Sequence, residues 1–73
     1  MTTGYLLYNS YSERYEIDDI ELHCGDCFQV FVDGQWIDTR IELNKNGYYL
    51  VDLPNVLLHG LFLRNFPLSF PHN

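Results

Sequence analysis

One short segment holds the side chains best suited to metal or redox chemistry. Cys24 and Cys27 enclose Gly25, which permits the tight turn that presents two thiolates to one zinc ion. His23 precedes the pair and is a third candidate ligand. His59 or His72, elsewhere in the chain, could supply a third or fourth ligand. Because no second Cys-x-x-Cys is present and the histidines lack ligand spacing, a structural turn is the better interpretation, and a small zinc-stabilised domain is the alternative.

Acidic side chains are concentrated in the first third of the chain. Paired carboxylates can perform acid–base chemistry or hold calcium, but their spacing does not match the D-x-D-x-D-G run of an EF-hand loop. A solvated loop is the simplest interpretation, and a loop that attracts a basic partner is the alternative. These acids are Glu13, Glu16, Asp18, Asp19 and Glu21. For the alternative, we assign Glu13, Asp18 and Asp19 to partner binding.

Aromatic residues make up 16% of the chain, and two of them are predicted to face each other across a hairpin. Phe31 and Trp36 form a cross-strand pair on the face away from the core, worth about 0.2–1 kcal/mol to the sheet. Either Phe66 and Phe70 cover this pair, or it stays exposed and binds a partner. Trp and Tyr are enriched at binding hot spots. The tyrosines assigned to the same partner surface are Tyr11, Tyr15 and Tyr49.

No side chains are arranged for catalysis. The serines lack an identifiable general base, and no glycine-rich loop of the kind that holds a phosphate occurs in the sequence. A chain of 73 residues is also too short to enclose a deep cleft that excludes water. We therefore predict a protein that is not an enzyme and needs no cofactor.

The charge balance limits the class of partner. Ten acidic and four scattered basic residues give a net charge of −6, which argues against direct binding of nucleic acid or anionic lipid. The apolar runs are too short to span a membrane, and no export signal is recognisable, so we expect a cytoplasmic protein with reduced cysteines. The predicted partner is another protein with a basic surface. Exposed edge strands are compatible with a monomer or a weak homodimer.

The central residues predict a hairpin that positions the aromatic pair. Residues 27–32 are β-branched and aromatic, and residues 35–43 alternate between apolar and polar. Asp33-Gly34 between them is typical of a two-residue type I′ turn, which places Phe31 opposite Trp36. The predicted core face of the hairpin consists of Phe28, Val30, Ile37, Thr39, Ile41 and Leu43.

Shorter strands are predicted at residues 4–8, 14–17, 48–53 and 61–64. Residues 18–21 form an acidic connection, and residues 54–60 fit one short helical turn before the last strand. In the third of these strands, Leu50 is expected to point inward opposite Ile41. A slip of one residue would turn Tyr49 inward instead.

These elements favour an all-β fold, a small, partly open SH3-like barrel of about five antiparallel strands. The long connection over residues 9–26 takes the place of the large first loop of that fold. An OB-type barrel is the second choice, because it usually needs more chain and a longer helix. We expect one β-barrel domain over residues 1–65 and a C-terminal tail over residues 66–73.

The centre of the chain has the form Asp-Gly-x-Trp-Ile-x-Thr-Arg-Ile-Glu, from Asp33 to Glu42. Further characteristic residues are Gly25-Asp26, Phe28-Gln29-Val30, Gly47, Tyr49-Leu50-Val51 and Leu58-His59-Gly60-Leu61. In these residues the stretch 22–65 resembles a family of short proteins known only as a domain of unknown function. Its members come from Gram-positive bacteria and are often carried on plasmids, integrative elements or phages. The resemblance implies a small β-barrel and a mobile-element origin, and it supplies no activity or ligand.

The leading hypothesis is a non-enzymatic protein-interaction module that acts on a protein of the host or of the mobile element. It would bind through Trp36, Phe31 and the tyrosine- and acid-rich first loop. The alternative from a different class is the zinc-stabilised domain built on Cys24, Cys27 and His23.

Overall fold

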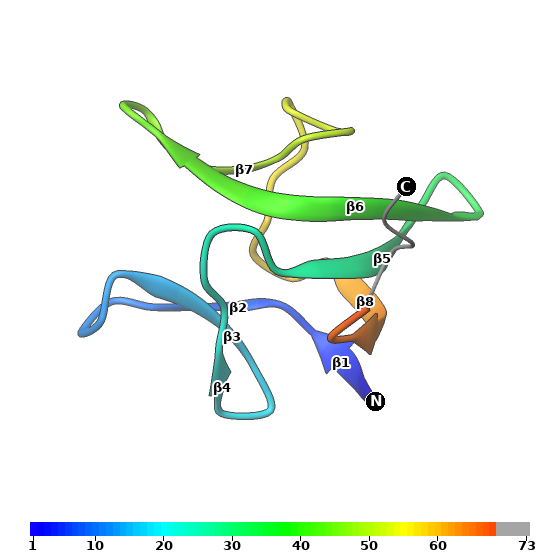
Figure 1. Ribbon diagram of the computed structural model, residues 1–73, viewed down its shortest axis with the longest axis horizontal. Coiled ribbons are helices and arrows are strands. Elements are labelled where there is room, and N and C mark those ends of the chain that lie inside the picture. Colours follow the sequence, from blue (N-terminus) through cyan, green and yellow to red (C-terminus); the bar gives the residue numbers. More distant parts are fainter. Residues whose placement is uncertain (69–73) are drawn as a thin grey trace.

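The computed structural model describes residues 1–68, which form two antiparallel sheets (Figure 1). Among these residues no helix is present, and so none with the length and apolarity to cross a bilayer. The prediction of an all-β fold is confirmed. The strands are β1 (Thr2–Tyr5), β2 (Leu7–Asn9), β3 (Arg14–Ile17), β4 (Ile20–Glu21), β5 (Cys27–Val32), β6 (Gln35–Asn44), β7 (Gly47–Leu50) and β8 (Phe62–Phe66).

The larger sheet has the strand order β1-β8-β5-β6-β7, and the β5–β6 hairpin lies at its centre. Asp33 and Gly34 form the turn with φ of 51° and 77°, the left-handed values that a type I′ turn requires. The predicted register is confirmed, since Val30 pairs with Ile37 and Phe31 pairs with Trp36. A strongly local turn signal was therefore enough to set this register.

The β6–β7 hairpin also has the predicted register, in which Ile41 pairs with Leu50 and both side chains are fully buried. The assignment of Leu43 to the core is wrong, because its side chain is 52% exposed. Leu43 pairs with Tyr48 close to the end of the hairpin. Alternation predicts the face to which a side chain points, but burial also requires an opposing element to cover that position.

The smaller sheet has the order β2-β3-β4 and contains a hairpin that sequence reasoning treated as an acidic connection. Ile17 pairs with Ile20, so Asp18 and Asp19 form a two-residue turn with φ of 48° and 64°. Aspartate tolerates this left-handed region better than most residues. The Asp-Asp dipeptide between two isoleucines was therefore a turn signal as well as an acidic one.

The predicted strand over residues 4–8 is interrupted at Leu6, which lies between β1 and β2. The Leu6 N–H donates to the Leu61 carbonyl at 2.8 Å, and the Gly60 N–H donates to the Leu6 carbonyl. The Leu6 side chain is fully buried. At this residue the chain passes from one sheet to the other, and the buried side chain together with two backbone hydrogen bonds fixes the crossing.

The helical turn predicted over residues 54–60 is wrong, because the structure has only separate turns in this segment. The Val56 N–H donates to the Leu53 carbonyl and the Leu61 N–H to the Leu58 carbonyl, without the consecutive bonds of a helix. The Gly60 N–H donates to a carbonyl far away in sequence, as described above. Tertiary pairing with the first strands therefore replaces local helical bonds.

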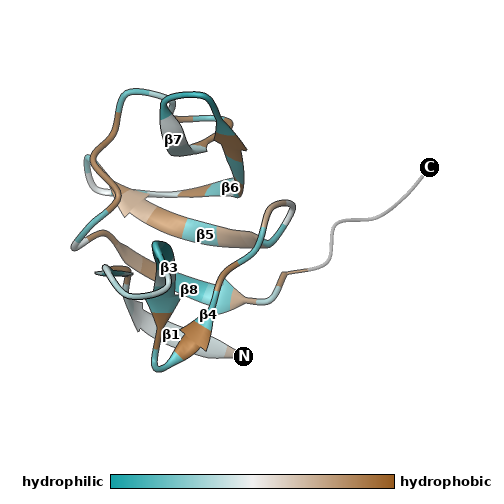
Figure 2. Cartoon of the chain, turned by 90° about the vertical axis from the view of Figure 1, so that its left-hand side faces the viewer, coloured by the Kyte–Doolittle hydropathy of each residue, from teal (hydrophilic) through white to brown (hydrophobic). Residues whose placement is uncertain are grey.

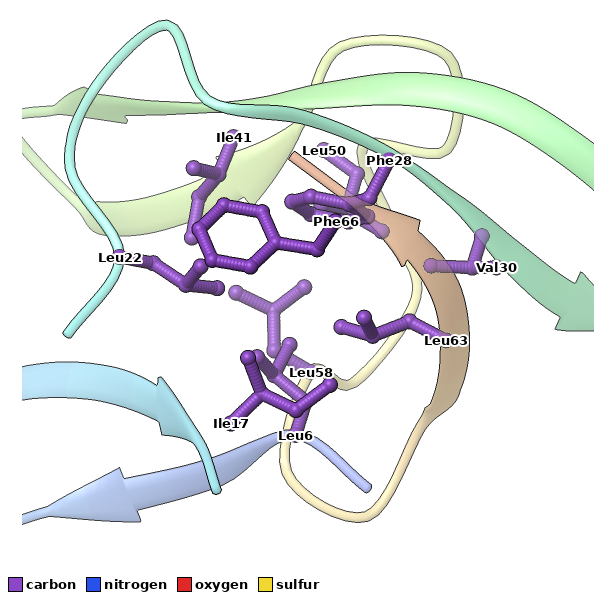
Figure 3. Close-up of a cluster of buried hydrophobic side chains, with 10 residues drawn as sticks. All are labelled: Leu6, Ile17, Leu22, Phe28, Val30, Ile41, Leu50, Leu58, Leu63 and Phe66. Carbon is purple, nitrogen blue, oxygen red and sulfur yellow. The ribbon is translucent and has the colours of Figure 1, made fainter. Parts of the chain in front are cut away.

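The core lies between the two sheets, where side chains from both point toward one another (Figure 3). Phe66 of β8 is only 5% exposed, and its ring packs against that of Phe28 with centroids 6.3 Å apart. The last strand thus includes one residue beyond the expected domain end at residue 65. The buried apolar side chains are Leu6, Ile17, Leu22, Phe28, Val30, Ile41, Leu50, Leu58, Leu63 and Phe66.

Candidate functional site

Four aromatic rings lie side by side on the face of the larger sheet that points away from the core. Alternation along β5 and β8 buries Val30 and Leu63, so the neighbouring Phe31 and Phe62 point outward. Centroid distances are 4.9 Å from Tyr5 to Phe62, 5.7 Å from Phe62 to Trp36 and 5.1 Å from Trp36 to Phe31. We call these four residues, Tyr5, Phe62, Trp36 and Phe31, the aromatic row.

An arginine of β8 is held on top of this row. The Arg64 guanidinium carbon lies 4.0 Å from the centroid of the Trp36 ring, a cation–π contact worth about 0.5–1 kcal/mol at an exposed site. The Arg64 Nε–H donates to Gln29 Oε1 at 2.9 Å, and Asn65 Nδ2 donates to the same oxygen at 2.7 Å. Gln29 Nε2 donates in turn to Asp38 Oδ1 at 2.7 Å. These bonds fix the orientation of the guanidinium before any partner binds.

The row remains accessible over much of its length. The Tyr5 side chain is 61% exposed and that of Phe31 is 44% exposed, while Trp36 and Phe62 are half-buried. Phe66 was one of two residues suggested as a cover for the Phe31–Trp36 pair, but its side chain is buried in the core. The other, Phe70, lies outside the described residues. Figure 2 shows β5 as mainly hydrophobic with one hydrophilic section, in keeping with Gln29 as its most polar residue.

A hollow of about 360 Å³ adjoins the row at Tyr5. The residues that line it are Gly4, Tyr5, Leu7, Glu16, Asp18 and Asp19. At Gly4, an added Cβ would lie 3.5 Å from the Asp18 carboxylate oxygen Oδ1, which is an ordinary van der Waals contact. Glu16 is held in place by Asn9, whose Nδ2 donates to Glu16 Oε2 at 2.8 Å. The hollow therefore combines strand residues of both sheets with the acidic β3–β4 turn.

The structure brings Trp36 and Phe31 together as predicted and places Asp18 and Asp19 beside the same surface through Tyr5. Sequence reasoning missed Phe62, Arg64 and the contribution of Tyr5. The outward positions on either side of Leu63 were readable from alternation in the last strand. The pairing of that strand with β5 and β1 joins segments distant in sequence, so no local turn motif predicts it.

Tyr15 does not join the aromatic row. Its ring contacts those of Tyr8 and Tyr48, with centroids 5.1 Å and 6.0 Å away, and it packs against the core. Burial raises the pKa of the Tyr15 hydroxyl, and the nearby Tyr8 adds to this effect. Arg14 Nη1 also donates to the Tyr48 hydroxyl at 3.2 Å. These contacts connect β3 to β7.

Tyr11, Glu13 and Tyr49, also assigned to the partner surface, lie elsewhere. Tyr11 and Glu13 occupy the β2–β3 turn, where Tyr11 is fully exposed. Figure 1 shows this turn and the β5–β6 turn at opposite ends of the long axis. Tyr49 lines a separate hollow beside the β6–β7 turn, together with Tyr48 and Pro54. The predicted set of eight residues is therefore not one continuous site.

The Cys-x-x-Cys segment forms a backbone turn. The Asp26 N–H donates to the His23 carbonyl at 3.0 Å, and Asp26 Oδ2 accepts from the His23 N–H at 2.8 Å. The Gly25 N–H donates to the Ile41 carbonyl, which fastens the turn to β6. Within residues 1–68, no group of three or more His, Cys, Asp or Glu side chains is arranged to hold a metal ion. His72 lies outside these residues.

The two thiols have different surroundings. Cys24 is exposed, and Cys27 is half-buried with its Sγ 3.4 Å from the Gly25 carbonyl oxygen. Burial raises the pKa of the Cys27 thiol, Arg40 opposes this effect, and Asp26 and Glu42 reinforce it. At neutral pH Cys27 is therefore a protonated, poorly nucleophilic thiol, which fits a structural position.

Known proteins are similar to this chain in sequence and fold. A family described as a domain of unknown function, DUF5348, matches residues 4–64. A crystal structure of a protein from Ruminococcus gnavus is similar with a TM-score of 0.75 and 37% sequence identity, over 88% of this chain and 100% of that one. No curated protein matches significantly. These similarities name no ligand, partner or activity.

Proposed function

The chain belongs to the DUF5348 family, a domain of unknown function, and we propose that it is a non-enzymatic module that binds another protein through the aromatic row. The membership confirms the resemblance to a family of unknown function. The observation that carries the proposal is the exposed row itself, with Arg64 fixed over Trp36. Large rigid rings and an oriented arginine are the side chains that dominate binding energy at protein interfaces.

Two features of the row, its length and its exposed ends, support a binding role over simple packing. The pair of Phe31 and Trp36 alone already gives the hairpin a stabilising cross-strand contact. The row continues across β8 to Tyr5 on β1, and its two ends remain exposed. An apolar surface of this kind on a small acidic protein is typical of an interaction site.

The proposal extends to the setting of the protein. The two-sheet arrangement supports an SH3-like, partly open barrel, and the central Asp-Gly-x-Trp-Ile-x-Thr-Arg-Ile-Glu run supports an origin on a bacterial mobile element. On this proposal the module acts in the cytoplasm, on a protein of the host or of the element. It binds neither nucleic acid nor membrane directly, in keeping with a net charge of −6.

The test is affinity capture from the source cell with the wild-type chain and two variants. Trp36→Ala removes the central ring of the row, and Tyr11→Ala removes a fully exposed ring outside it. We expect Trp36→Ala to reduce the captured partner about fivefold or more, in line with a hot-spot residue. Tyr11→Ala should leave capture unchanged.

Thermal unfolding of each variant shows whether the fold is intact. If Trp36→Ala is unstable, Phe31→Ser serves instead, because this ring is more exposed. Equal capture by the wild-type chain and by a folded row variant would refute the proposal.

A further inference from the structure

The hollow beside Tyr5 is lined by residues of two chemical kinds. Leu7, which is 52% exposed, and the exposed ring of Tyr5 provide apolar surface. Glu16, Asp18 and Asp19 are acidic. A volume of about 360 Å³ is near the lower limit for ligand sites, which suits one side chain better than a whole small molecule.

Lysine and arginine have the amphipathic character that suits a lining of apolar and acidic residues. Their aliphatic stems pack on apolar surface while the charged group remains near polar partners. The Tyr5 ring additionally attracts a cation through its π-face. A side chain of this type would place its stem along Leu7 and Tyr5 and its charge among the carboxylates.

Resting on the function proposed above, we propose that the occupant of the aromatic row is a positively charged segment of another protein. Its apolar residues lie on the row, and one lysine or arginine enters the hollow beside Tyr5. Tyr5 belongs to both features, so a single extended segment can reach them together. The hollow thereby selects the partner by charge, while the row supplies most of the contact area.

The assignment of a positively charged partner rests on the negative charge of this chain and of the hollow. The chain has a net charge of −6, and the lining of the hollow includes three acids and no lysine or arginine. Arg14, which lies in β3 with Glu16, forms an ion pair with Glu21, and its Nε is 3.3 Å from Glu21 Oε1. A segment with the opposite charge is attracted to this site, and salt weakens the attraction.

The arrangement also gives the bound segment a direction. Arg64 lies over Trp36 and repels a cation at that position. Asp18 and Asp19 lie at the other end of the surface, beside Tyr5. The positive side chain of the partner therefore binds at the Tyr5 end, and an apolar or acidic residue faces Arg64.

The test uses three capped peptides that differ only in charge. The probes are Val-Lys-Val-Lys-Val-Lys and the same sequence with Glu or with Gln in place of Lys. Binding is followed by NMR chemical shifts of the ¹⁵N-labelled chain. We expect the Lys peptide to bind about five- to tenfold more tightly than the Gln peptide and to shift Tyr5, Asp18 and the Trp36 indole together. The Glu peptide should bind most weakly.

Two double variants separate a local effect from net charge. Asp18→Asn with Asp19→Asn removes two carboxylates from the hollow, and asparagine keeps the left-handed turn. Asp33→Asn with Asp52→Asn changes the net charge by the same amount at exposed sites outside the hollow. Only the first pair should lower affinity for the Lys peptide to that for the Gln peptide.

The outcomes distinguish this inference from the function on which it rests. If Trp36→Ala weakens all peptides while the Asp18 and Asp19 variant binds the Lys peptide normally, the row is a binding site and the basic partner is refuted. If neither variant changes binding, both are refuted. A concentration-dependent dimer that Trp36→Ala dissociates without peptide would assign the row to a second copy of this chain and also overturn the inference.

Discussion

Gln29 makes hydrogen bonds to three side chains at the candidate site. Its carbonyl oxygen accepts hydrogen bonds from Arg64 and Asn65, and its amide nitrogen donates to Asp38. Arg64 is therefore oriented on the face of Trp36 by a neighbouring side chain as well as by the ring. A partner meets a guanidinium that is already ordered, which lowers the entropy lost on binding.

The change Gln29→Leu should release Arg64 from Trp36. We expect a loss of about 1 kcal/mol in the free energy of unfolding, because two donors lose their acceptor on a partly exposed face. The ring-current shift of the Arg64 δ-protons above Trp36 should decrease in NMR spectra. Asp38→Asn is the control, since an asparagine oxygen still accepts from Gln29. An unchanged Arg64 shift in the leucine variant would contradict this account.

Cys27 and Cys24 should differ in reactivity as a function of pH. Burial raises the pKa of the Cys27 thiol. At a given pH, a smaller fraction of this thiol is therefore ionised than in a thiol with the ordinary pKa. We expect iodoacetamide to modify exposed Cys24 first at about pH 8, with the Cys27 rate still rising at higher pH. Mass spectrometry of the tryptic peptides measures both rates. Faster reaction at Cys27 in the folded chain would be the contrary result, and the urea-unfolded chain is the control.

At the scale of the strand, β8 contributes residues to both the core and the surface, and the left-handed Asn65, with φ of 58°, interrupts the alternation between Leu63 and Phe66. Leu63 and Phe66 are buried, while Phe62 and Arg64 belong to the outer face. The same strand therefore connects stability to the candidate site. Its two phenylalanines offer a matched comparison between these roles.

Phe66→Ala should destabilise the fold by about 3–5 kcal/mol, because it leaves a cavity against Phe28 in a small core. Phe62→Ala removes the same atoms from a half-buried position and should cost much less. Urea denaturation of both variants measures the difference. In the binding assays the order should reverse, with Phe62→Ala impaired and any folded Phe66 variant active. Equal destabilisation by the two changes would contradict the assigned faces of β8.

Sequence reasoning succeeded where turn chemistry is local. Asp33-Gly34 set the pairing of Phe31 with Trp36, and the following hairpin placed Leu50 opposite Ile41. It was wrong for Leu43 and for the helical turn at residues 54–60, since burial and hydrogen bonding there depend on segments distant in sequence. Local patterns carry no information about such distant partners.

At the scale of the whole molecule, the candidate surface depends on both sheets. The aromatic row needs β1, β8, β5 and β6 to be adjacent, and the acidic hollow needs the smaller sheet to pack beside β1. Trp36 and Phe31 could be found from the sequence because one hairpin carries them. The roles of Phe62, Arg64 and the hollow could not be predicted from the sequence. They depend on the crossing of the chain at Leu6 and on the pairing of β8 with β1 and β5, which are contacts between distant segments.

Trp36 is the only tryptophan of the chain and lies in the row, so its fluorescence reports directly on occupancy of the proposed surface. The most direct measurement is a titration of the wild-type chain with the captured partner, followed by Trp36 emission and acrylamide quenching. A partner without tryptophan, or one with its tryptophans replaced by phenylalanine, keeps the signal specific. The account predicts a saturable change in emission and protection from acrylamide. Full binding by an independent assay, with unchanged emission and quenching, would contradict it.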